Sequence, residues 1–169
     1  MNDATIYHYK LIRKLNLLPE MKYAYLVTAF MGIAVLSVLD RWAGFIFSLL
    51  GLVLMFAVHA IVLKITLRRV EEPAEKKWFL RFDLPWIGPL PVSDTSLSLF
   101  RRLHFHLLLV GCCVAGLFYP WTSASLVIAL IYWHFWLLAP RFYLLMRMRK
   151  DRGDGVIRLQ GSEISYYHR

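Results

Sequence analysis

The sequence predicts an all-α integral membrane protein with four transmembrane helices in two helical hairpins, followed by a short cytoplasmic C-terminal β-hairpin. Hydrophobic residues make up 59% of the 169-residue chain, above the roughly 45–50% of soluble domains. These residues gather in four long runs, and the lysines and arginines lie mostly at the ends of the runs or between them. This separation of apolar and basic residues is typical of a membrane protein.

The four apolar runs cover residues 24–39, 42–65, 103–119 and 126–138. A transmembrane helix needs about 20 apolar residues. The second run reaches this length by itself, and the other three runs approach it once flanking residues are counted. Every backbone amide inside a bilayer needs a partner in its own segment, so we expect helices. Short joins at 40–41 and 120–125 then produce two hairpins, at 22–67 and 101–146.

The distribution of basic residues predicts the orientation. Four precede the first run, eight lie between Lys64 at the end of the second run and the start of the third, and seven follow the fourth, whereas the two hairpin tips hold only Arg41. Lysine and arginine favour the cytoplasmic side, so both termini and the central loop are expected there, in a bacterial plasma membrane. The net charge of +9 indicates contact with anionic inner-leaflet lipids. No groove-reading motif accompanies it, and no nucleic acid is expected.

The N-terminal segment, residues 1–21, is predicted to be cytoplasmic. Residues 4–18 could form a basic amphipathic helix on the inner leaflet, because Ile12 and Leu15 would share one helical face. The segment lacks the apolar core and cleavage site of a signal peptide, so Met1 is expected to be the retained start.

The central loop, residues 68–100, contains four prolines, which exclude one continuous helix. Its apolar part is expected to lie against the membrane or another protein, with Trp78, Phe82 and Trp86 as anchors. A serine or aspartate could cap the next helix. The candidates for this cap are Ser93, Asp94 and Ser96.

The basic tail, residues 147–169, is predicted to contain a β-hairpin with a type II′ turn at Gly161-Ser162. The expected pairs are Gln160 with Glu163, Leu159 with Ile164, Arg158 with Ser165, and Ile157 with Tyr166. A lone two-stranded ribbon needs a cover for its apolar face, which the central loop or another chain could supply. The predicted partner-binding residues are Trp78, Phe82, Trp86, Ile157, Leu159, Ile164 and Tyr166.

Three histidines are the candidate ligands for a cofactor. His59, His106 and His134 each lie roughly 6–11 Å inside the nearest cytoplasmic charge, so they would share one level and could hold haem or a transition metal. Two other interpretations remain open: an aromatic belt at the membrane surface, and polar ties between helices. His104 and His106 are two residues apart on one helix and cannot both face one point.

The function predicted first is that of a non-catalytic accessory or assembly subunit of a larger membrane complex. The apolar runs hold no carboxylate, and the adjacent Cys112 and Cys113 form neither a disulfide framework nor a zinc knuckle. No catalytic motif is present, which weighs against an enzyme. The expected partner is another membrane protein or a second copy of the chain. The alternatives are a haem- or metal-binding protein and a transporter protomer acting as an oligomer.

Overall fold

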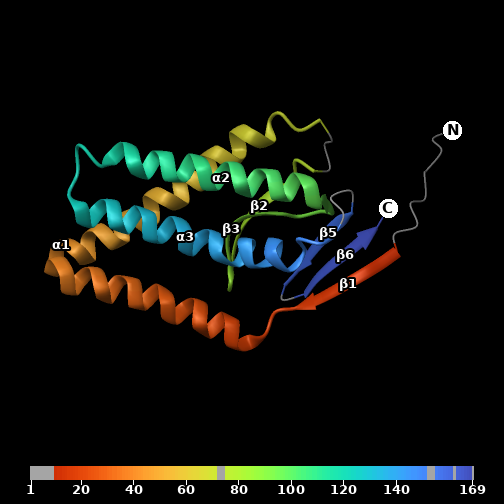
Figure 1. Cartoon of the computed structure of the whole chain (residues 1–169), viewed down its shortest axis with the longest axis horizontal. Coiled ribbons are helices and arrows are strands. Elements are labelled where there is room, and N and C mark those ends of the chain that lie inside the picture. The colour runs from red at the N-terminus through yellow and green to blue at the C-terminus, as the bar shows by residue number, and fades with distance from the viewer. Residues whose placement is uncertain (1–9, 72–74, 152–154, 162, 169) are drawn as a thin grey trace.

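The computed structural model describes residues 10–71, 75–151, 155–161 and 163–168. Three helices run along the long axis of the molecule, and a four-stranded sheet lies at one end of them (Figure 1). A separate two-stranded hairpin lies near the same end. The architecture is mostly helical, as predicted, with more strands than expected.

Helix α1 (Pro19–Leu67) takes the place of two predicted helices. Its backbone leaves the helical conformation at Asp40 (φ −134°, ψ 25°) and Arg41 (φ 50°, ψ −131°). The chain folds back there, so that a first arm (residues 19–39) is followed by a second arm (residues 42–67) (Figure 1). The arms leave no room beside Gly44, where a Cβ would lie 1.9 Å from the carbonyl oxygen of Leu36. The described chain thus has three helices and not four, because the reversal occupies two residues only.

Helices α2 (Leu97–Phe118) and α3 (Ala124–Arg147) form the predicted second hairpin. The hydroxyl of Ser123 caps α3 by accepting a hydrogen bond from the amide of Leu126 at 3.4 Å. Thirteen of the 24 residues of α3 are buried, against seven of 22 in α2, so α3 is the centre of the bundle. All three helices are long and apolar enough to cross a membrane.

The predicted N-terminal amphipathic helix is wrong for the part of it that the structure describes. Lys10–Asn16 form strand β1, which pairs antiparallel with β6 (Glu163–His168). The edge of β6 offers backbone hydrogen-bond partners along its length. These partners stabilise a strand more than the weak amphipathic pattern of this segment would stabilise a helix. Residues 4–9 of the predicted helix lie outside the described residues.

The predicted C-terminal hairpin is confirmed in its position and register. Strand β5 (Val156–Gln160) pairs with β6 through the four expected pairs, including Leu159 with Ile164. Gly161 has a φ of 57°, as a tight turn requires. Ser162 lies outside the described residues, so the turn type stays a prediction. The short β4 (Thr95–Ser96) completes the sheet in the order β1-β6-β5-β4.

The central loop forms a second hairpin, of β2 (Trp78–Asp83) and β3 (Trp86–Pro91). It contains no continuous helix, as its prolines predicted. Ser96 does occupy the N-cap position of α2, but its side chain makes no capping bond, and its amide donates to Oε1 of Glu75 at 2.9 Å. Asp94 forms an ion pair with Arg158 instead of capping the helix.

One apolar core joins the sheet to the ends of the helices. It explains how the C-terminal hairpin is covered, because the hairpin, the central loop, α2 and α3 all contribute to it. Its buried members are Leu17, Trp86, Leu90, Leu97, Phe100, Leu144, Leu145, Met148, Ile157, Leu159, Ile164 and Tyr166. The chain therefore supplies this cover itself.

Candidate functional site

Two of the three predicted histidines meet inside the bundle. Nε2 of His59, on the second arm of α1, is 2.8 Å from Nδ1 of His134 on α3. Nε2 of His134 is 3.1 Å from the carbonyl oxygen of Leu108 on α2, which can only accept. In the neutral imidazole, His134 therefore donates to Leu108, and His59 donates to His134. This chain of hydrogen bonds joins all three helices.

The third predicted histidine does not join this pair. His106 is exposed, whereas His104, two residues earlier on α2, is fully buried. The Nδ1 of His104 donates to the carbonyl oxygen of Phe100 at 2.7 Å. Its Nε2 has no hydrogen-bond partner among the described residues. Sequence reasoning chose His106 by its depth, but the rotation of α2 turns His104 inward.

The histidine pair does not fit a haem or a metal ion. The ring nitrogens of His59 and His134 are in direct hydrogen-bond contact, which leaves no space for a group between them. A Cβ on Gly111 would lie 2.1 Å from Cε1 of His134, so α2 closes the other side. No cluster of three or more His, Cys, Asp or Glu side chains within the described ranges is arranged to hold a metal.

Further hydrogen bonds tie α3 to α1. The indole of Trp133 donates to the hydroxyl of Ser48 at 3.3 Å, and that of Trp136 donates to the carbonyl oxygen of Tyr25 at 3.1 Å. The hydroxyl of Tyr132 donates to the carbonyl oxygen of Thr28. Each of these donors lies on α3, so this helix binds both arms of α1 through side chains.

Arg141 is a cation buried in the interior of the molecule, with 2% of its surface exposed. Its guanidinium donates to the carbonyl oxygen of Leu137 on α3 and to that of Ile87 on β3, the latter at 2.8 Å. Gly88 (φ 111°) lies against it, and a Cβ there would be 2.8 Å from Nη2. Sequence reasoning took Arg141 as the first cytoplasmic charge. The structure shows that it holds the β2–β3 hairpin on the bundle.

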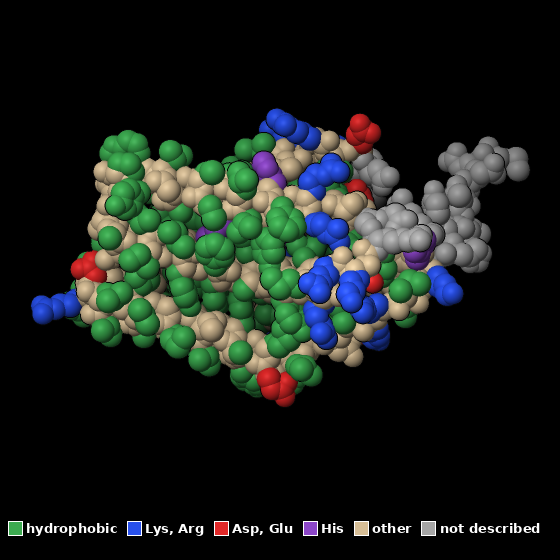
Figure 2. All heavy atoms as spheres, in the orientation of Figure 1, with side chains coloured by type: hydrophobic (Ala, Val, Ile, Leu, Met, Phe, Trp, Pro, Cys, Tyr) green, Lys and Arg blue, Asp and Glu red, His purple; other side chains and the backbone are tan. Residues whose placement is uncertain are grey.

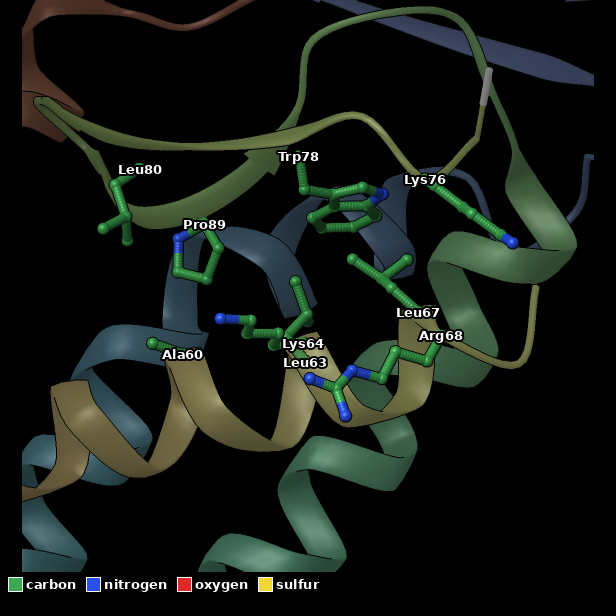
Figure 3. Close-up of a pocket in the computed structure, with 9 residues that line it drawn as sticks. All are labelled: Ala60, Leu63, Lys64, Leu67, Arg68, Lys76, Trp78, Leu80 and Pro89. Atoms are coloured by element: carbon green, nitrogen blue, oxygen red, sulfur yellow. The ribbon is translucent and has the colours of Figure 1, made fainter. Parts of the chain in front are cut away.

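An open pocket of about 430 Å³ lies between the last turns of α1 and the β2–β3 hairpin (Figure 3). Its walls are mostly apolar, and three cations, Lys64, Arg68 and Lys76, lie along it. The other lining residues are Ala60, Leu63, Leu67, Trp78, Leu80 and Pro89. Of these nine residues, only Trp78 was singled out from the sequence, because the pocket forms from segments that meet only in the fold.

A second, apolar groove of about 600 Å³ opens on the side of the bundle, between the first arm of α1 and α3. Its lining residues are Thr28, Met31, Ile128, Ile131, Tyr132, Phe135, Trp136 and Ala139. No charged residue lines it. Its surface is thus suited to contact with lipid chains or with an apolar helix.

Most of the residues predicted to bind a partner are buried in the chain's own core. This holds for Trp86 and for the four residues of the C-terminal hairpin, Ile157, Leu159, Ile164 and Tyr166. Trp78 is half-buried and stacks on Phe100, while Phe82 remains 69% exposed. The apolar character of the buried five is explained by intramolecular packing.

Comparisons of the chain with known protein families, with curated proteins and with solved structures find no match. The function is therefore argued from the geometry alone.

Proposed function

We propose that the chain is a multi-pass protein of a bacterial plasma membrane, with its sheet and both termini on the cytoplasmic side. The observation that carries this proposal is the separation of side chains along the long axis. Lysine and arginine gather at the sheet end, while hydrophobic side chains spread over the helices (Figure 2). Basic residues favour the cytoplasmic side of a membrane, which gives the orientation.

The biochemical role that we propose is that of a non-catalytic accessory or assembly subunit. The interior around α3 is filled by side chains that bind one another, and its polar groups serve to hold helices together. The groove between the first arm of α1 and α3 supports a partner role, because it is apolar and opens sideways at the level of the helices. Transmembrane helices associate by close packing on such surfaces. We assign the partner contact to this groove, occupied by a transmembrane helix of another membrane protein.

The orientation is tested by cysteine labelling of intact cells. In a Cys112→Ser/Cys113→Ser background, single cysteines replace Arg41, Thr122 or Lys150, and a membrane-impermeant maleimide is added. We expect labelling at Arg41→Cys and Thr122→Cys in intact cells, and at Lys150→Cys only after permeabilisation. Equal labelling of all three before permeabilisation would contradict the proposed orientation.

The partner role is tested by a photo-crosslinking amino acid in the groove. We expect Ile131, which lines the groove, to give one discrete adduct with another membrane protein that also copurifies in constant ratio. Leu109, 64% exposed on α2, is the matched control and should give none. An adduct with a second copy of the chain would mean that the groove is a contact within a homo-oligomer and not with another protein. Identical patterns at both positions would contradict the assignment of the groove.

A further inference from the structure

The pocket at the cytoplasmic end of α1 combines an apolar interior with a basic rim. The second arm of α1 forms its floor through Leu63 and Leu67, and the β2–β3 hairpin forms its roof through Leu80 and Pro89 (Figure 3). Its volume of about 430 Å³ lies within the roughly 300–1,000 Å³ of ligand pockets. The pocket can therefore take an apolar chain together with a charged group.

The cations of the rim are available to a ligand. Lys64 and Arg68 are four residues apart on α1, and Figure 3 shows the Lys64 ammonium beneath Pro89 and the Arg68 guanidinium turned back along the helix toward it. In the part of the chain that the structure describes, neither forms an ion pair with a carboxylate. Like charges at this spacing repel each other and destabilise a helix. An anion between them would remove that repulsion.

The position of the pocket indicates which class of anion it suits. Lys64 and Arg68 lie at the end of the second arm, while Ala60 and Leu63 precede them on its apolar part. A ligand here would have its charge at the cytoplasmic surface and its apolar part toward the bilayer. Free phosphate would use the cations but leave the apolar walls uncovered. An amphiphile uses both.

We propose that this pocket binds an anionic phospholipid of the inner leaflet, with its phosphate at Lys64 and Arg68. One acyl chain packs against Ala60, Leu63 and Leu80, and Lys76 adds positive charge at the rim. This inference rests on the proposed membrane location and adds a specific lipid site to it. A general attraction of the basic surface to anionic lipid does not require such a site.

The test uses the full-length protein in neutral detergent, with bound lipid counted by native mass spectrometry. The protein is titrated with phosphatidylglycerol, with phosphatidylcholine of the same chains, and with inorganic phosphate as a competitor. We expect one phosphatidylglycerol per chain in preference to phosphatidylcholine, without displacement by phosphate. Lys64→Gln/Arg68→Gln should weaken this binding about 25-fold, since each basic residue near an anionic lipid contributes a factor of about five.

Two further variants separate the pocket from general electrostatics. Arg149→Gln/Lys150→Gln removes the same charge from exposed positions outside the pocket and should change the affinity less than about twofold. Ala60→Trp keeps every cation but fills the pocket, and should abolish the stoichiometric binding. Circular dichroism of each variant confirms that it is folded.

Four results would overturn the inference: equal weakening by both double variants, unchanged binding in Ala60→Trp, absence of any lipid preference, or displacement of the lipid by inorganic phosphate. The last would identify phosphate itself as the ligand. Absence of lipid preference together with the expected cysteine labelling contradicts this inference alone. Reversed or absent labelling contradicts the proposed membrane location as well.

Discussion

Helix α3 and the C-terminal hairpin are both largely buried, but different interactions hold them in place. The polar contacts of α3 with its neighbours come from side chains, among them those of His134, Trp133 and Trp136. The hairpin is bound by backbone pairing to β1 and β4 on its two sides and by the apolar core beneath it.

This difference indicates where the molecule is sensitive to substitution. In the bundle, the polar contacts between helices depend on single side chains such as that of His134, which Gly111 allows to approach α2. In the sheet, the pairing is shared among many backbone groups, which side-chain changes other than to proline leave in place. We therefore expect large effects of single substitutions around α3 and small effects at the charged side chains of the sheet.

The largest effect is expected at Gly111. A Cβ there would lie 2.1 Å from Cε1 of His134, so Gly111→Ala should lower the free energy of unfolding by about 2–3 kcal/mol through overpacking. Gly116, also on α2, has no atom within 4 Å of such a Cβ. Gly116→Ala should therefore be neutral or stabilise by up to about 1 kcal/mol. SDS titration of the detergent-purified variants measures both, and equal values would break the comparison.

Removal of the buried histidine should have the next largest effect. His134→Ala removes hydrogen bonds to two helices and leaves a cavity, which should cost about 2 kcal/mol. His106→Ala, at an exposed position of α2, should change the free energy of unfolding by less than about 0.5 kcal/mol. The same SDS titration provides the measurement. A larger loss in His106→Ala than in His134→Ala would contradict the structural assignment.

A smaller effect is expected at the strongest ion pair of the sheet region. Asp94 accepts two hydrogen bonds from Arg158, at 2.6 and 2.7 Å. Both side chains keep part of their surface in solvent, so Asp94→Asn should lower the free energy of unfolding by about 1 kcal/mol. Asp83→Asn, at an exposed position in β2 with no ion pair among the described residues, is the control. A loss above that of His134→Ala would reverse the comparison.

The smallest effect is expected at Lys14 on β1. Its ammonium is 2.7 Å from Glu163, but the side chains are 50% and 39% exposed. Lys14→Ala should therefore cost no more than about 0.3 kcal/mol, and this cost should vanish at high salt. Unfolding in low and high salt tests both statements. A salt-independent loss above about 1 kcal/mol would mean that β1 depends on this pair.

The sequence predicted the strand register well where apolar and polar residues alternate one by one. The register of β5 with β6 followed from one apolar and one polar face around Gly161, and the structure confirms it. Strand β1 could not be recognised in the same way, because its partner lies about 150 residues away in the sequence. No local pattern marks such a pairing.

The helices were predicted only in part. Their presence was readable from apolar length, but their rotation was not, because runs that are apolar on every side give no inward face. This is why the meeting of His59 with His134 could only be suspected, and why His106 was chosen over His104. The reversal at Asp40 and Arg41 was located correctly, although the two arms form one helix element. The buried contact of Arg141 with Ile87 depends on the fold of the central loop and had no sequence signal.

The claim that His134 ties the helices together is tested most directly by a double-mutant cycle. The free energy of unfolding is measured by SDS titration for the unmodified chain, His59→Ala, His134→Ala and the double variant. The structure predicts a coupling of about 1 kcal/mol between the two histidines, in the range of hydrogen bonds between membrane helices. Additive effects, with a coupling of zero within error, would contradict it.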